Sequence, residues 1–197
     1  MSPVYATMSL SLDGYGAGPG QTEESPMGDI PGMALHRWMF ETPEENTEEQ
    51  ARILAGGAYI MGWNMFGPVR GAWSGDWQGW WGPEPPYHAP VFVLTHHERE
   101  PLALGDTTFH FVTDGIHAAL ERARDAAGER PVHIAGGPAT TNQYLRAGLV
   151  DELHLQIAPY LLGSGERLFE GVEPQQLELI DIRPVSLTTH VRYRVVR

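Results

Sequence analysis

Two adjacent glycines, Gly136 and Gly137, stand between an apolar run and a stretch of small polar residues in the segment HIAGGPATTNQYL. If a strand turns into a helix here, backbone N–H groups at the start of the helix are exposed, and the helix dipole favours an anion beside them. Pro138 suits the first helical turn, where its missing N–H costs little. The segment therefore predicts either a phosphate-binding cradle or a tight turn that binds nothing.

Two other predicted strand ends carry groups that suit the same ligand. The segment YIMGWNMFGP ends a strand at Gly62, and the segment FVLTHHERE ends one in Thr95, His96 and His97. Taken alone, Thr95–His96–His97 is more simply an exposed loop. Ligands of open α/β sheets collect at the carboxyl ends of strands, so three such ends together favour an elongated anionic ligand such as a dinucleotide.

The adjacent histidines also suggest a metal, but we expect no metal site. Consecutive loop residues seldom converge on one ion, and neither a His-x-x-x-His helix pair nor a cysteine is present. The G-x-G runs in GYGAGPG and GSGERL lack the third glycine and the following helix of a Rossmann fingerprint, so that fold is not expected.

The composition indicates one globular domain spanning residues 1–197. The net charge of −12, with scattered basic residues, makes the chain a poor partner for nucleic acid or an anionic membrane. No apolar run approaches the ~20 residues of a membrane span, and the N-terminus does not look like a signal peptide. The absence of cysteine fits a reducing compartment, so we expect a cytoplasmic protein.

Strand and helix patterns alternate along the chain. Helices are predicted at residues 32–40, from the N-cap Thr42 to Gly56, at 114–128 and at 138–148. Alternation implies right-handed crossovers and a mainly parallel sheet, and two final strands without a helix between them imply an antiparallel edge. We expect one α/β domain with about eight strands, at residues 4–12, 58–62, 90–95, 108–113, 131–136, 150–163, 177–182 and 187–196.

Four segments of the chain, in order, resemble the dihydrofolate reductase superfamily. They are SLSLDGYGAGP, AYIMGWNMFGP, PVFVLTHH and HIAGGPATTNQYLRAGLVDELHLQIAPYLLGSGERLF. The likeness is greatest to the RibD C-terminal domain, the reductase domain of the bifunctional riboflavin-biosynthesis deaminase/reductase, and to its single-domain relatives. It covers nearly the whole chain. It implies a mostly parallel, twisted eight-stranded sheet flanked by helices, bound NADPH, hydride transfer, and a homodimer.

The resemblance also implies a set of cofactor contacts. Members of the family commonly have an arginine at the position of Trp63, and that arginine pairs with the 2′-phosphate of NADPH. The indole of Trp63 can stack on adenine but cannot pair with a 2′-phosphate. NADH is therefore a second candidate cofactor, unless His97 or Arg99 compensates. The implied cofactor-binding residues are Gly62, Trp63, Asn64, Met65, Thr95, His96, Gly136, Gly137, Pro138, Ala139, Thr140 and Thr141.

On the substrate side, the resemblance makes Asp13 the candidate catalytic residue. The alternative for Asp13 is a turn-forming role before Gly14. Folate reductases carry a carboxylate on the first helix, where this chain reads LHRWMF, with Asp29 just before it, so a folate reductase is not expected. The candidate substrate-binding residues are Ser9, His36, Trp38 and Tyr160, although His36 also suits a helix surface and Trp38 the core.

The activity that the resemblance implies is reduction of a small heterocyclic or sugar-linked substrate, as by 5-amino-6-(5-phosphoribosylamino)uracil reductase. The alternatives are a specialised reductase of secondary metabolism and a non-catalytic nucleotide-binding protein of the same fold. One unusual segment, GAWSGDWQGWWGPEPPYHAP, carries Trp73, Trp77, Trp80 and Trp81. We interpret it as a packed loop, and an aromatic wall for a flat heterocycle is the alternative.

Overall fold

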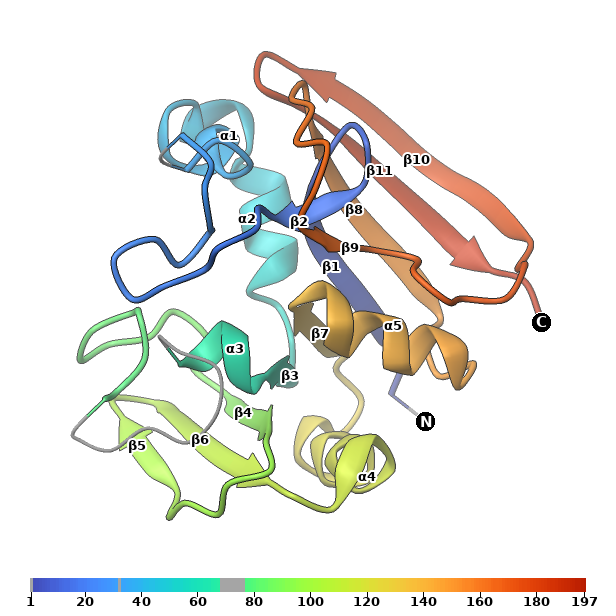
Figure 1. Ribbon diagram of the computed structural model, residues 1–197. Helices are drawn as coiled ribbons and strands as arrows, with labels where there is room; N and C mark the ends of the chain where they lie inside the picture. The colour runs from blue at the N-terminus through green and yellow to red at the C-terminus, as the bar shows by residue number, and fades with distance from the viewer. Residues whose placement is uncertain (1, 32, 68–76) are drawn as a thin grey trace.

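A nine-stranded sheet forms the centre of the computed structural model, which describes residues 2–31, 33–67 and 77–197 (Figure 1). Five neighbouring pairs are parallel (β8–β1, β1–β7, β7–β3, β3–β4 and β4–β6), and the three pairs at the two edges are antiparallel. The predicted mainly parallel sheet with an antiparallel C-terminal edge is confirmed. From edge to edge the strands are β10 (Leu177–Val185), β11 (Thr188–Val195), β8 (Glu152–Ala158), β1 (Val4–Ser11), β7 (Val132–Gly136), β3 (Ala58–Gly62), β4 (Pro90–Leu94), β6 (Thr107–Val112) and β5 (Leu102–Leu104).

Three short strands were not predicted. β5 pairs with β6 at the far edge and makes the sheet nine-stranded rather than eight-stranded. The strands β2 (Tyr15–Ala17) and β9 (Glu166–Arg167) form a separate antiparallel pair. Each has only two or three residues, too few for the alternation of side chains that marks a strand in a sequence.

The two faces of the sheet differ in chemistry because side chains alternate along each strand. On β1, the residues Val4, Ala6, Met8 and Leu10 enter an apolar core with α4 (Gly115–Ala127) and α5 (Pro138–Arg146). The opposite face of β1 presents Tyr5, Thr7, Ser9 and Ser11. This polar face is covered by α1 (Arg37–Phe40), the 3₁₀ turn η1 (Pro43–Glu45) and α2 (Thr47–Ile53).

The first two helices differ from their predicted bounds. The predicted helix at residues 32–40 begins only at Arg37, and Gly32 lies outside the described residues. Thr42 caps a 3₁₀ turn, and α2 starts at Thr47 after Asn46. The fully buried Asn46 donates hydrogen bonds to the carbonyls of Trp38 and Thr42, and this interrupts the helix. Within the described ranges, no helix is long and apolar enough to cross a membrane.

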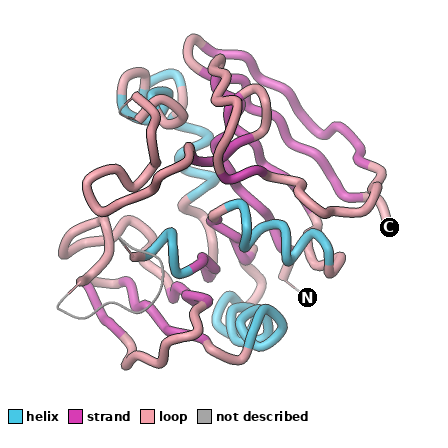
Figure 2. The backbone as a smooth tube through the Cα atoms, viewed as in Figure 1, coloured by secondary structure: helices cyan, strands magenta, loops and turns pink. Residues whose placement is uncertain are grey.

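The tryptophan-rich segment packs against the one-turn helix α3 (Trp63–Phe66) and strand β6. Trp77 and Trp80 donate their indole N–H groups to the carbonyls of Phe66 and Met65, at 2.7 and 3.0 Å. The ring of Trp81 stacks on Phe109. The packing interpretation is confirmed for Trp77 and Trp81, whereas Trp80 is exposed and Trp73 lies outside the described residues. Figure 2 shows that long loops, rather than helices, also lead into α1 and away from β8.

Candidate active site

The three predicted strand ends lie side by side. β7, β3 and β4 are adjacent and parallel, with Met61 opposite Gly136 and Gly62 opposite Leu94. The carboxyl ends of parallel strands meet at one edge of the sheet, so Gly62, Thr95 and Gly137 share that edge.

The glycine pair forms an open cradle at the start of α5. Gly136 has a φ of +111°, and a Cβ there would lie 3.1 Å from Cε of Met8, so this position requires glycine. Gly137, joined to it by a cis peptide bond, has an ordinary φ of −71°, and a Cβ there would have no atom within 4 Å. α5 begins at Pro138 without a side-chain cap, so the first N–H groups of the helix are available to an anion. The residues therefore fit a phosphate group.

Close packing of β3 against α5 shapes the same cradle. A Cβ on Gly62 would collide with Oγ1 of Thr140, so glycine at this position lets the helix approach the strand. Thr141 is fully buried, and its hydroxyl donates to the carbonyl of Gly137 at 3.2 Å. Thr140 and Thr141 thus hold the turn in shape, while Gly137 and Ala139 line the open side.

The other two strand ends form an aromatic corner. The rings of Trp63 and His97 lie 5.6 Å apart, and Oγ1 of Thr95 accepts a hydrogen bond from the backbone N–H of His97. Arg99 is engaged elsewhere. Its guanidinium stacks on Phe111, 5.0 Å from the ring centroid, and donates to the carbonyl of Trp77 at 2.6 Å. His96 and Asn64 are exposed and Met65 is half-buried, so the corner offers a flat ring surface more than a cationic one.

Asp13 clamps two loops together. Its carboxylate accepts hydrogen bonds from the hydroxyl of Ser11 at 2.6 Å and from the backbone N–H groups of Leu162 and Gly163 at 3.1 and 2.7 Å. The hydrogen bond from Ser11, followed by those from the two amides, lowers the pKa of Asp13 to about 2. Because an ionised carboxylate has no proton to give at neutral pH, the geometry supports a positioning role.

We expect Asp13→Asn to release the β8–β9 loop. The asparagine amide can present only one acceptor oxygen, so either Leu162 or Gly163 faces a second donor. Exchange of these two backbone amides with solvent should become up to roughly tenfold faster, and the melting temperature should fall. Hydrogen exchange followed by NMR measures this, with Glu23→Gln in the neighbouring exposed loop as the control. Unchanged exchange at both amides would contradict the clamp.

The candidate substrate-binding residues lie in more than one place in the structure. Trp38 is almost fully buried, and its indole N–H donates to Oγ of Ser9 at 3.2 Å, so these two side chains form a floor beneath the carboxyl end of β1. Burial lowers the pKa of His36 to about 4, so its imidazole is neutral at pH 7. Tyr160 follows β8 and lines a cavity on the far side of β1 from the cradle. The structure thus brings Ser9 and Trp38 together and places Tyr160 on the other side of β1.

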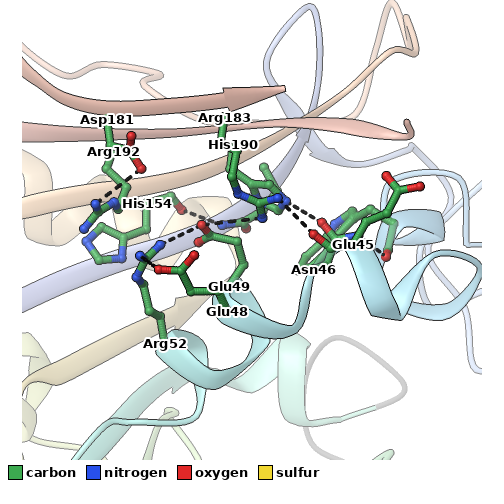
Figure 3. A network of polar contacts seen from close by, with 12 residues as sticks. Glu45, Asn46, Glu48, Glu49, Arg52, His154, Asp181, Arg183, His190 and Arg192 are labelled. Atoms are coloured by element: carbon green, nitrogen blue, oxygen red, sulfur yellow. Dashed lines mark hydrogen bonds and ion pairs between the residues drawn. The ribbon is translucent and has the colours of Figure 1, made fainter. Parts of the chain in front are cut away.

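A polar network missed by the sequence analysis fixes α2, and with it α1, on the sheet (Figure 3). The buried carboxylate of Glu49 pairs with Arg52 at 2.7 Å and with Arg183 of β10 at 3.7 Å. His190 of β11 lies 2.6 Å from Oδ1 of Asn46. The network joins residues 46–49 to residues 183–190, more than a hundred positions further along the chain, so no local sequence pattern could reveal it.

The fold and the cradle together define a class. The chain is a mixed α/β protein of the dihydrofolate reductase-like type, with a mostly parallel sheet, flanking helices and an antiparallel C-terminal edge. Residues 3–191 match the model of the RibD C-terminal domain, and the chain belongs to that family.

One curated relative matches this chain over about half of its length. The chain is similar to an uncharacterized protein, YyaP, of Bacillus subtilis (strain 168), at 29% identity over 97 residues. That match covers 49% of this chain and 48% of YyaP, so it spans about half of the curated relative.

Solved structures agree in fold. A putative riboflavin biosynthesis protein from Shewanella sp. PV-4 superposes with a TM-score of 0.63 at 22% identity, covering 99% of both chains. RibD of Acinetobacter baumannii superposes with a TM-score of 0.65 at 18% identity, covering 100% of this chain and 59% of that one. A pyrimidine reductase-like protein from Corynebacterium diphtheriae has a TM-score of 0.61 at 17% identity, covering 100% of this chain and 92% of that one.

Proposed function

We propose that the protein is a nicotinamide-dependent reductase that uses NADPH, or NADH, to reduce a small heterocyclic or sugar-linked substrate. The observation that carries this proposal is the open space at Gly137, at an uncapped helix start on the edge where three parallel strands end. Membership of a family named for the reductase domain of RibD supports it. One solved relative, from Thermotoga maritima, is described as a deaminase and 5-amino-6-(5-phosphoribosylamino)uracil reductase.

In this proposal, different residues at this edge of the sheet bind different parts of the cofactor. The N–H groups at the start of α5 and the backbone of Gly137 hold the pyrophosphate. Trp63 stacks on the adenine, and Thr95 and His96 lie beside its ribose. The aromatic corner holds no arginine in the place of Trp63, so we expect the preference for NADPH over NADH to be weak.

The bound cofactor would supply a hydride, and the chain would orient the partners and exclude water. The buried pair of Ser9 and Trp38 would support, from beneath, the place where the reacting ring of the substrate lies beside the end of β1. Asp13 positions the loop that closes over it, and the neutral imidazole of His36 offers a hydrogen bond without a charge. We place this enzyme in the cytoplasm, in keeping with a chain that contains no cysteine.

Titration with the two cofactors tests the proposal. Binding of NADPH or NADH, followed by the quenching of tryptophan fluorescence near Trp63, is expected at micromolar concentrations. If neither cofactor binds at high micromolar concentration, the proposed function fails. If NADPH binds but is never oxidised with pyrimidine, pterin or imine substrates, the protein is instead a non-catalytic nucleotide-binding member of the fold.

We also propose that the protein is a homodimer, because the β10–β11 hairpin exposes apolar side chains on one face. A bulge between Leu179 and Asp181 shifts the register by one residue, so Leu177, Leu179 and Ile182 all point to that face. Their exposed fractions are 38%, 53% and 56%. A long edge strand with exposed apolar groups favours pairing with a second copy.

Ile182→Glu should convert the dimer to a monomer, because two carboxylates would meet across a two-fold axis. Sedimentation velocity at several protein concentrations measures the change. Glu178→Gln, in the same strand but on the opposite face, should leave the dimer intact. A wild-type monomer at all concentrations, or a dimer that survives Ile182→Glu, would contradict this interface.

A further inference from the structure

A cavity of about 580 Å³ opens at the carboxyl end of β8, and Tyr160 is the one candidate substrate-binding residue in its lining. Its walls come from the loop before α1, from α1 itself, from the segment after β8 and from the β10–β11 turn. Its volume lies within the range of small-molecule sites. The apolar part of the lining consists of Pro31, Met33, Ala34, Phe40, Pro159 and Leu187.

The polar groups of this lining leave no net positive charge. Arg37 is the one basic residue among the lining residues, and its Nε and Nη2 donate to the two carboxylate oxygens of Glu41 at 2.8 and 2.7 Å. This two-point pairing balances the charge of the guanidinium and uses two of its five N–H donors. Tyr160 is the remaining polar side chain of the lining, and its hydroxyl is uncharged.

Carboxylates flank the cavity on two sides. Glu45 accepts hydrogen bonds from the backbone and hydroxyl of Ser186, next to the lining residue Leu187. On the other side, the ionised Asp13 binds the backbone N–H of Leu162, two residues after Tyr160. Arg183 leads into the same turn, but its guanidinium bonds to the carbonyl of Glu45 and pairs with Glu49. The one lining cation, Arg37, is paired with Glu41, so a dianionic phosphate in this cavity would meet repulsion from the nearby carboxylates without an unpaired lining cation to offset it.

The cavity lies where the far end of a hydride acceptor would be. It opens at the end of β8, and the phosphate cradle opens at the end of β7, with β1 between them. Neighbouring strands are about 4.8 Å apart, and β8 runs three residues further along β1 than β7 does, so the two strand ends are separated by roughly 14 Å. A nicotinamide and an acceptor ring that meet above the end of β1 span that distance, and the rest of the acceptor then falls beside Tyr160.

Resting on the proposed function, we propose that the hydride acceptor is an uncharged, unphosphorylated molecule whose apolar part occupies this cavity. The hydride leaves C4 of the dihydronicotinamide and forms a C–H bond at the carbon of a C=O or C=N group. The π electrons of that group move to its oxygen or nitrogen, which takes a proton from water. The nicotinamide is oxidised, and the acceptor is reduced to an alcohol or an amine.

A matched pair of probes tests the substrate class without knowing the substrate. 2-Naphthol and 2-naphthyl phosphate share one ring system and differ by the phosphate. With NADPH present, ligand-observed NMR should show 2-naphthol binding at least about tenfold more tightly, a difference of ~1.4 kcal/mol. Equal or tighter binding of the phosphate ester would overturn the proposal.

Two variants locate the binding. Leu187→Glu, in the β10–β11 turn where Leu187 is half-buried, should weaken 2-naphthol binding about tenfold or more and leave NADPH affinity unchanged. Ala34→Phe, which fills the cavity from the opposite wall, gives a second measurement with the same expected result. Leu54→Gln, an exposed apolar position just after α2, is the control.

The outcomes separate the two proposals. Naphthol binding that persists in both cavity variants overturns the acceptor site, whether or not NADPH binds. If NADPH fails to bind the wild-type protein while 2-naphthol still binds in the cavity, the proposed function fails and the cavity remains an apolar ligand site.

Discussion

Gly137→Val should abolish NADPH binding while leaving the melting temperature within a degree or two of the wild-type value. A Cβ at this position meets no atom within 4 Å, and the backbone φ of −71° is one that valine adopts. The folded protein therefore has room beside Gly137 for the Cβ of a larger residue. That room is the space in which the pyrophosphate would approach the start of α5, so we expect affinity to fall by about a hundredfold or more, ~3 kcal/mol. Fluorescence titration well below the melting temperature measures it.

The opposite end of the same helix supplies a matched control. Gly148 also has no neighbour within 4 Å of an added Cβ, but its φ of +65° strains any other residue. Gly148→Val should thus lower the free energy of unfolding by about 1–3 kcal/mol and leave NADPH affinity unchanged. Near-wild-type affinity in Gly137→Val would show that the glycine pair is only a turn, and it would remove the main structural support for a dinucleotide site.

The parallel direction of the central strands, and the edge on which they end, could be predicted from the sequence because strand and helix patterns alternate along the chain. Residues 58–62 and 90–95 are short predicted strands that end in glycine and threonine, and the structure places them side by side as β3 and β4. The turn from strand to helix could likewise be predicted, since two glycines followed by proline are typical of the point where a strand ends and a helix begins. The sequence could not show whether each glycine faces a neighbour or empty space, because that depends on distant segments such as β1, whose Met8 lies beside Gly136 and not beside Gly137.

The apolar cavity could not be predicted because no single segment forms it. Pro31 precedes α1, Phe40 is the last residue of α1, Tyr160 follows β8, and Leu187 lies in the final turn. Each of these residues reads as an ordinary loop or surface residue until the fold brings them together. The same holds for Asp13, whose partners Leu162 and Gly163 lie about 150 residues away along the chain. Contacts between loops carry no periodicity, so they are outside the reach of pattern-based inference.

Acidification from pH 7 to pH 4 should destabilise the protein steeply. Burial lowers the pKa of His36, His133 and His190 to about 4, from the ordinary value of 6.5. Between these values the unfolded chain binds protons that the folded chain does not, so the free energy of unfolding falls as the pH falls through this window. Below about pH 4 the imidazoles of the folded protein also become protonated, and the contribution of these buried histidines to the free energy of unfolding has then been lost.

His133 offers the sharpest test because its ring is only 2% exposed and lies between aromatic groups of three strands. Its neighbours are Thr7, at 3.3 Å from Nδ1, and the rings of Tyr5, Tyr59 and His154, none of which carries a negative charge at pH 5. Each unit of pKa difference corresponds to about 1.4 kcal/mol, so His133 alone accounts for on the order of 3 kcal/mol of this pH dependence.

His133→Gln keeps a polar group beside Thr7 but removes the titrating ring. Urea unfolding at pH 7, 6, 5 and 4 should show a clearly shallower decline for this variant, even if its stability at pH 7 is lower. The control is His117→Gln, since His117 is exposed on α4 and meets water in both the folded and the unfolded state. If the decline for His133→Gln is as steep as for the wild type, the buried neutral imidazole is not what makes the fold sensitive to acid.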